Sequence, residues 1–225
     1  MISRRDRIEG MLNTIEHEYQ TTWRYTGRRA ANPKVLDAMG LVPREEFVPQ
    51  ALKPSAYANN ALPIGDGQTI SQPFIVALMT DLLCPEKDHV VLEVGAGSGY
   101  QAAVLSVMVR QVYSVEIVPA LAIEAAERLA RLGYNNVEIR SGDGYRGWAE
   151  HAPFDGIIVT AAVPHLPPAL LDQLRPGGRL VVPVGMPYMH QELMAVEKDQ
   201  HGVLHTRDVL GVIFVPLTGE GGAPG

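Results

Sequence analysis

Apolar residues in the first part of the chain recur at intervals of three and four positions. Positions this far apart fall on one face of a helix. We therefore predict an amphipathic helix over residues 8–19, whose buried face carries Ile8, Met11, Leu12, Ile15 and Tyr19.

A second short helix is predicted from Asn32-Pro33 to Gly40. Asparagine is a good helix cap, and proline is favoured at the first helical position. Residues 43–65 are rich in proline, alanine and asparagine without a clear period, so we predict irregular chain with short turns there.

From His89 onward the pattern changes to short β-branched runs bounded by Gly, Pro or Asp. These predicted strands are VVLEV (90–94), VYSVE (112–116), VEIRS (137–141), GIIVT (156–160) and RLVVPV (179–184). Helical segments such as LAIEAAERLARL lie between them. Strands that alternate with helices are typical of a parallel sheet covered on both faces.

The end of the chain departs from this alternation. ELMAVEK and VLGVIFVPL are apolar runs after Pro187 with no convincing helix between them, which favours an antiparallel pair. The predicted fold class is α/β, with a doubly wound, mostly parallel seven-stranded sheet, an antiparallel C-terminal strand pair and an N-terminal helical extension. We divide the chain into an N-terminal helical and covering segment (1–84), a sheet-containing core (85–220) and a flexible tail (221–225).

Composition and charge narrow the class of protein. The chain has 225 residues, 46% hydrophobic residues, a formal net charge of -6 and a pI near 5.6. Such a charge does not favour duplex nucleic acid or an anionic membrane as a partner. The single cysteine, Cys84, permits no internal disulfide. His, Cys and acidic residues show no metal-ligand spacing, so no metal is expected.

The first twenty residues carry charges throughout, unlike a signal peptide, and no run reaches transmembrane length. We therefore expect a cytoplasmic protein that is a monomer or a weak homodimer.

A glycine-rich segment, VLEVGAGSGY (91–100), connects the first predicted strand of the sheet to a helix. Gly95, Gly97 and Gly99 have the spacing of a nucleotide-type cofactor loop, where glycine permits the turn and a close approach of the ligand. The alternative is a close strand-to-helix turn that binds nothing. Glu116 ends the next strand, where a carboxylate can bind both ribose hydroxyls; the alternative is an exposed strand-end acid.

A dinucleotide and S-adenosylmethionine both suit this arrangement. SGDGYRGW (141–148) contains Asp143-Gly144, a pair that can present a carboxylate and a backbone amide to an adenine edge. LRPGGRLVVPVG (174–185) is typical of many S-adenosylmethionine enzymes, and the chain has no evident Tyr-x-x-x-Lys pair of a nicotinamide enzyme. A methyltransferase with a Rossmann-like fold is therefore favoured.

Several segments, in the same order along the chain, give a more specific identification. The sequence closely resembles the protein-L-isoaspartate O-methyltransferase family in ALPIGDGQTISQPFIVALMTDLL (61–83), VLEVGAGSGYQAAVL (91–105), GDGYRGWAEHAPFDGIIVTAA (142–162), PPALLDQLRPGGRLVVPVG (167–185) and VPLTGE (215–220). The resemblance implies methyl transfer from S-adenosylmethionine to the free α-carboxylate of isoaspartyl residues in damaged proteins and peptides. The ester then cyclises to a succinimide, whose hydrolysis returns some normal aspartate.

The resemblance also implies roles for individual residues. Ser71, in the segment GDGQTISQPF (65–74), takes the position of the family's active-site serine; the alternative is that Ser71 is only a helix N-cap. Glu93 stands at the acidic position of the family's glycine loop, so the resemblance places it with the cofactor-binding residues. Cofactor contact is implied for Gln68, Thr69, Ile70, Ala96, Glu116, Asp143, Gly144 and Thr218.

Asn59 departs from the family pattern, which has Asp at this position and Pro at that of Ala61. The acceptor carboxylate is already ionised near neutral pH, so it needs hydrogen-bond donors and no general base. We hypothesise that Asn59 substitutes for the aspartate as an orienting group at the active site. The alternative is a turn asparagine without contact to the substrate.

Three other functions stay open at this point. The first is a family-related O-methyltransferase that acts on a different protein or peptide carboxylate. The second is a cofactor-binding module that has lost catalysis, and the third is a nicotinamide oxidoreductase.

Overall fold

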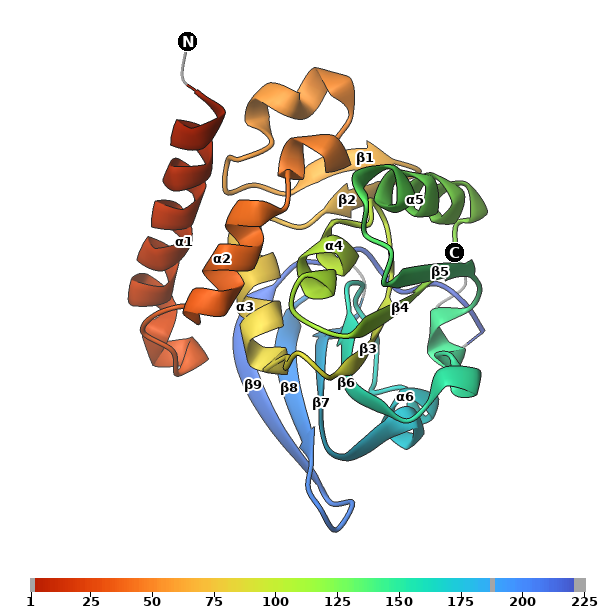
Figure 1. The fold of residues 1–225 in the computed structure, drawn as a ribbon. Helices are drawn as coiled ribbons and strands as arrows, with labels where there is room; N and C mark the ends of the chain where they lie inside the picture. The colour runs from red at the N-terminus through yellow and green to blue at the C-terminus, as the bar shows by residue number, and fades with distance from the viewer. Residues whose placement is uncertain (1–2, 187–188, 221–225) are drawn as a thin grey trace.

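The computed structural model describes residues 3–186 and 189–220 (Figure 1). The helices are α1 (Arg4–Thr26), α2 (Pro33–Leu41), α3 (Pro73–Leu83), α4 (Tyr100–Ser106), α5 (Pro119–Leu132) and α6 (Pro168–Gln173), with short 3₁₀ helices at Arg44–Phe47, Gln50–Ser55, Gly144–Arg146 and Ala149–His151. The strands are β1 (Leu62–Gly65), β2 (Gln68–Ile70), β3 (Val90–Val94), β4 (Gln111–Glu116), β5 (Val137–Ser141), β6 (Phe154–Val159), β7 (Leu174–Gly185), β8 (Gln191–Lys198) and β9 (Leu204–Val212).

The main sheet has seven strands in the order β5-β4-β3-β6-β7-β8-β9. Strands β3 to β7 pair in parallel, whereas β7–β8 and β8–β9 pair antiparallel. The predicted fold class, with its antiparallel C-terminal pair, is therefore confirmed. Because strand order reverses between β3 and β6, the carboxyl ends of these two neighbouring strands form the edge where such sheets bind ligands.

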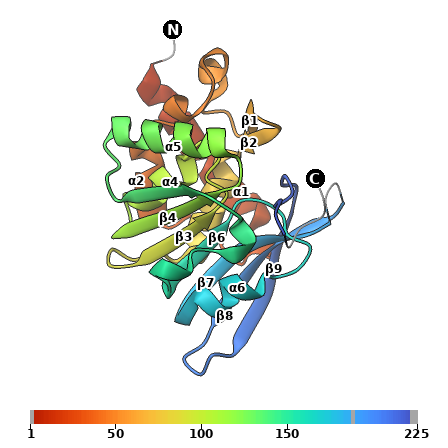
Figure 2. The ribbon, with the colours of Figure 1, turned by 90° about the vertical axis from the view of Figure 1, so that its right-hand side faces the viewer.

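Both faces of the sheet are covered (Figure 2). Successive residues of β3 belong to different apolar clusters. Val91 belongs to the cluster that contains residues of α1 to α4, and Leu92 belongs to the cluster that contains Trp148 and residues of α6. The first cluster joins residues from both sides of the predicted boundary at 84/85. The division into segments 1–84 and 85–220 stays a prediction, and the predicted tail 221–225 lies outside the described residues.

The predicted N-terminal helices form, and α1 is longer than the apolar pattern indicates. Ser3 and Asp6 make a reciprocal capping box at its start, and Gly27 ends it in a left-handed conformation. Helix α2 begins as predicted, because the Asn32 side chain accepts a hydrogen bond from the N–H of Lys34. It ends at Leu41, one residue beyond Gly40.

The last strand lies earlier than the predicted run 209–217. β9 ends at Val212, and the following residues leave the sheet edge. Ala162 donates its N–H to the carbonyl of Val215 and accepts the N–H of Leu217, both at 2.8 Å. These hydrogen bonds bring Thr218 to the carboxyl end of the parallel strands.

Among the described residues, no helix combines the length and the apolarity that a membrane crossing demands.

Candidate active site

The segment GDGQTISQPF forms a small hairpin followed by a helix. β1 and β2 pair antiparallel, and the turn between them contains Asp66 and Gly67 with φ of +50° and +70°. Asp-Gly suits a two-residue hairpin turn with two positive φ angles. Sequence analysis missed this hairpin because β2 is only three residues long.

Ser71 follows β2 directly and is partly buried. Its carbonyl accepts a hydrogen bond from Nη2 of Arg44 at 2.7 Å. The N-cap of α3 is Gln72, so the alternative interpretation of Ser71 as a helix cap is wrong. The Ser71 side chain is therefore available for another purpose.

Arg44 is fully buried beneath this segment. Its Nε donates to the carbonyl of Ala56 at 2.7 Å, and its guanidinium lies 4.7 Å from the centre of the Tyr100 ring. Burial lowers the pKa of Arg44. The arginine thus ties the irregular segment before β1 to the backbone of Ser71.

The predicted glycine loop connects β3 to α4. Gly95 has φ of +98°, and a Cβ on it would collide with the hydroxyl of Thr160. That hydroxyl donates to the Gly95 carbonyl at 2.6 Å. Gly99 is the N-cap of α4 and packs against Leu129, so its side of the loop faces the protein interior.

Glu116 lies at the carboxyl end of β4 and is 5% exposed. Its Oε2 accepts the N–H of Gly97 at 2.8 Å, and its Oε1 accepts the N–H of Val118 at 2.9 Å. Each carboxylate oxygen has a second lone pair. Glu116 therefore holds the glycine loop in place and can still accept hydrogen bonds from a ligand.

Glu93 lies inside the sheet, completely buried. Burial raises the pKa of its carboxyl group to about 8, against an opposing hydrogen bond from the hydroxyl of Ser114. The structure therefore places Glu93 beneath the glycine loop, where it does not line the cavity described next.

These elements surround a cavity of about 790 Å³. The sequence-predicted residues that line it are Gln68, Thr69, Ile70, Ser71, Gly95, Ala96, Gly97, Glu116, Gly144 and Thr218. Asn59, Glu93, Gly99 and Asp143 do not line it. We refer to this hollow as the inner cavity.

Asp143 does not line the inner cavity but holds two of the segments that line it. One carboxylate oxygen accepts the N–H of Tyr145 and the other accepts the N–H of Glu220, each at 2.9 Å. The side chain therefore joins the turn that carries Gly144 to the segment that carries Thr218.

A second hollow, the outer cleft, opens to solvent beside the inner cavity and measures about 1760 Å³. Thr69, Ser71, Thr160 and Val215 line both hollows and form the wall between them. Sequence analysis missed Thr160, although its place directly after β6 is a signal for a site residue.

Glu18 of α1 also lines the outer cleft, and sequence analysis missed it. Its Oε1 accepts a hydrogen bond from Nδ2 of Asn59 at 3.2 Å. Oδ1 of Asn59 accepts the N–H of Phe74 at 3.1 Å, at the start of α3. The structure thus places Asn59 between a cleft residue and the helix that follows Ser71.

Comparison with known proteins assigns the family. The family model for protein-L-isoaspartate(D-aspartate) O-methyltransferase matches residues 21–222. Protein-L-isoaspartate O-methyltransferase 2 of Syntrophobacter fumaroxidans is 60% identical over 209 residues, which are 93% of this chain and 85% of the relative. The protein of the same name from a Polaromonas species is 55% identical over 93% of this chain and 100% of its own length.

Solved structures show the same fold. A protein-L-isoaspartate O-methyltransferase superposes with a TM-score of 0.82 at 29% identity, covering 96% of this chain and 67% of that one. A Plasmodium falciparum protein in complex with S-adenosyl-L-homocysteine superposes with a TM-score of 0.76 at 23% identity, covering 93% and 97%. The family match over most of the chain and these relatives lead to one conclusion: the chain belongs to the protein-L-isoaspartate(D-aspartate) O-methyltransferase family.

Proposed function

We propose that the protein transfers a methyl group from S-adenosylmethionine to the free α-carboxylate of L-isoaspartyl residues in damaged proteins and peptides, which starts their repair through a succinimide. The family assignment supports this activity. The observation that carries it is the shared wall of Thr69, Ser71, Thr160 and Val215, which separates a glycine-lined cavity from an open cleft. Such an arrangement lets a cofactor in the cavity and a polypeptide in the cleft meet at these shared residues.

The residues of the inner cavity fit the cofactor. The close approach of Thr160 leaves no room for a side chain at Gly95, so the cavity keeps a bare backbone surface there. S-adenosylmethionine supplies an electrophilic methyl group when it is bound. Glu116 accepts hydrogen bonds from the ribose hydroxyls, and Gln68, Thr69, Ile70, Ala96, Gly97 and Thr218 contact the cofactor.

Asp143 and Glu93 support the cofactor site without touching its cavity. Asp143 places Gly144 for contact with the adenine edge, because its carboxylate fixes the backbone on both sides of the cavity wall. Glu93 and Gly99 keep the glycine loop packed on the sheet.

The acceptor carboxylate is anionic at neutral pH, so the site has to orient it and exclude water. Ser71 donates a hydrogen bond that points one carboxylate oxygen toward the inner cavity. Arg44 fixes the Ser71 backbone, and Asn59 orients the cleft through Glu18 and α3. Ser71 is thus the catalytic residue of the proposal, and Asn59 is a positioning residue.

The wider setting of the enzyme is part of the same proposal. We expect a cytoplasmic monomer or weak homodimer whose partners are isoaspartyl proteins and peptides. The net charge of -6 supports the absence of nucleic acid and membrane partners.

The test measures methyl transfer from labelled S-adenosylmethionine to two peptides that differ only in an isoaspartyl or a normal aspartyl linkage. We expect selective labelling of the isoaspartyl peptide, loss of labelling in Ser71→Ala and unchanged cofactor binding in that variant. Ser55→Ala is the matched control, because Ser55 is exposed and lies outside both hollows.

Labelling of neither peptide, with cofactor binding intact, would reject the isoaspartyl acceptor. The alternative function would then be an O-methyltransferase of this family that acts on a different protein or peptide carboxylate. Asn59 favours this alternative, because it replaces the family's aspartate at a position that contacts Glu18 of the outer cleft.

A further inference from the structure

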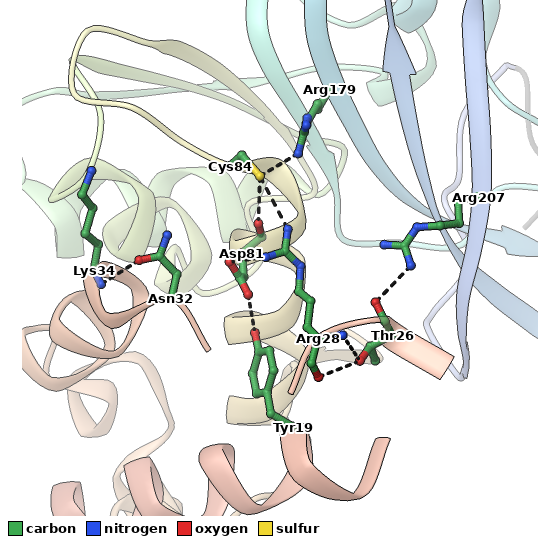
Figure 3. A network of polar contacts seen from close by, with 9 residues as sticks. All are labelled: Tyr19, Thr26, Arg28, Asn32, Lys34, Asp81, Cys84, Arg179 and Arg207. Atoms are coloured by element: carbon green, nitrogen blue, oxygen red, sulfur yellow. Dashed lines mark hydrogen bonds and ion pairs between the residues drawn. The ribbon is translucent and has the colours of Figure 1, made fainter. Parts of the chain in front are cut away.

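Three arginines from distant parts of the sequence converge where the helical layer ends over the antiparallel part of the sheet. Arg28 follows α1, Arg179 lies on β7 and Arg207 lies on β9 (Figure 3). They line a pocket of about 690 Å³ together with Leu82, Ala195, Val196, Glu197, His205 and Thr206. We call this hollow the arginine pocket. It shares no lining residue with the inner cavity or the outer cleft.

Two of the guanidinium groups are held side by side by one sulfur atom. Sγ of Cys84 accepts a hydrogen bond from Nη1 of Arg179 at 2.7 Å and lies 3.6 Å from Nη2 of Arg28. Arg28 also pairs with the buried Asp81 at 3.1 Å, and Asp81 accepts a hydrogen bond from Tyr19 at 3.3 Å. Figure 3 shows these groups around the end of α3.

The third guanidinium is fixed by the backbone of α1. Nη1 of Arg207 donates to the carbonyl of Thr26 at 3.0 Å. Arg207 is opposite Ala195 in the β8–β9 ladder, and His205 is opposite Glu197. Because side chains two residues apart point to the same face of a strand, Arg207 and His205 share the face that the pocket occupies.

The pocket has more positive than negative charge. Three guanidinium groups face two carboxylates, since Asp81 pairs with Arg28 and Glu197 pairs with Arg179 at 3.1 Å. His205 is paired with Asp199, which lies outside the pocket lining. The two carboxylates neutralise two of the three guanidinium groups, which leaves one positive charge to attract a further anion. This concentration of arginines stands out in a chain whose net charge is -6.

The arginines also keep hydrogen-bonding capacity for a ligand. Each guanidinium carries five N–H donors, and the contacts described above use at most two of them per side chain. The planar donor fork of arginine matches the oxygens of phosphate and carboxylate groups. We propose that Arg28, Arg179 and Arg207 form a binding site for an oxyanion, a phosphate or carboxylate group.

The position of the arginine pocket suggests two sources for this group. α1 and β9 border both the outer cleft, at Thr22 and Leu210, and the arginine pocket, at the Thr26–Arg207 contact. Leu210 and Arg207 are three residues apart, roughly 10 Å along an extended strand. An acidic side chain a few residues from the acceptor residue can therefore reach the pocket. This source rests on the proposed function, whereas a free oxyanion does not.

The first experiment is a calorimetric titration of the full chain with inorganic phosphate, at constant ionic strength maintained with chloride. We expect saturable binding that weakens about tenfold or more in Arg179→Gln and in Arg207→Gln, because each removes charge-assisted hydrogen bonds. Arg5→Gln is the matched control, because it changes the net charge equally at a side chain that is 87% exposed. Circular dichroism verifies that each variant is folded. Arg28 is left intact because its loss would strand the buried Asp81.

Absence of phosphate binding to the unmodified protein would overturn the proposal, and so would equal affinity in Arg207→Gln. A second experiment separates the two sources by comparing isoaspartyl peptides with Glu or Gln placed three to five residues from the isoaspartyl linkage. A lower KM for the Glu peptide that disappears in Arg207→Gln identifies the acceptor as the source. Equal KM values, together with phosphate binding that depends on Arg207, identify a free oxyanion. If neither peptide is methylated, the proposed function fails, and the phosphate titration still decides the oxyanion site.

Discussion

Nδ2 of Asn59 donates a hydrogen bond to Oε1 of Glu18 at 3.2 Å, across the boundary between the segment before β1 and helix α1. The same amide accepts the N–H of Phe74 through its oxygen. An aspartate at position 59 would keep the second contact and lose the first. The departure from the family pattern at Asn59 is therefore coupled to a carboxylate on helix α1.

Asn59→Asp should lower the free energy of unfolding by about 1 kcal/mol near pH 7, because it places a carboxylate against that of Glu18 in a partly buried setting. Urea denaturation measures the change. The double variant Glu18→Gln/Asn59→Asp should recover most of the loss, since the amide at position 18 can donate to the new carboxylate. Additive effects of the two substitutions would show that the pair is not coupled.

Arg44→Met should reduce kcat more than it reduces cofactor affinity, because the carbonyl of Ser71 loses its donor, whereas the hydrogen bonds of the glycine loop are made with Glu116 and Thr160. We expect a loss of about 2 kcal/mol in unfolding free energy, since one buried and one partly buried carbonyl lose their hydrogen bonds. Arg44→Lys should have a kcat and an unfolding free energy between those of the unmodified protein and Arg44→Met. A single ammonium group cannot reproduce the planar donor fork of arginine. Arg131→Lys, at an exposed arginine, is the control. A change in KM alone would contradict the positioning role.

Gly95→Ala should weaken cofactor binding by about tenfold or more, because the added methyl group collides with Thr160 in the wall of the inner cavity. Gly133→Ala is a close control: Gly133 also has a positive φ, of +85°, and a Cβ there meets only open space. Fluorescence titration with S-adenosylhomocysteine compares the two variants. Equal affinities would contradict the prediction, because Gly133 does not line the inner cavity.

Glu93 should make stability fall with rising pH. Burial raises the pKa of this carboxyl group from 4.5 to about 8, so the folded protein holds the proton that the unfolded chain releases. The stabilisation is full below pH 4.5, decreases as the pH rises toward 8 and is lost above it. Urea denaturation at several pH values should therefore give a flatter profile for Glu93→Gln than for the unmodified protein. An unchanged slope between pH 5 and 8 would contradict this, and Glu9→Gln serves as an exposed control.

The order of strands and helices follows from the sequence because β-branched runs and helical periods alternate clearly after residue 89. The hairpin β1–β2 does not follow, because its strands are short and their pairing depends on an Asp-Gly turn within a polar stretch. The position of the last strand was also predicted wrongly, because β9 ends at Val212 and not at residue 217. The hydrogen bonds of Ala162 decide it, and they join residues more than fifty positions apart.

Some residues of the candidate site could likewise be predicted from the sequence, whereas others could not. Gly95 and Glu116 could be found because motif spacing places them at the ends of strands, and Ser71 because its segment resembles the family's. Arg44 and Glu18 could not, because their roles come from contacts across the fold to Ser71 and Asn59. The resemblance placed Glu93 with the cofactor-binding residues, whereas the structure buries it within the sheet, away from the inner cavity.

The wall formed by Thr69, Ser71, Thr160 and Val215 has one further consequence. Because the same four side chains bound both hollows, a ligand in either hollow fixes the wall that the other ligand meets. The two binding free energies are then linked, and linkage is reciprocal: whatever factor the cofactor adds to acceptor affinity, the acceptor returns to the cofactor. The same linkage applies to the demethylated cofactor, whose presence then changes the affinity for the methylated polypeptide after the transfer.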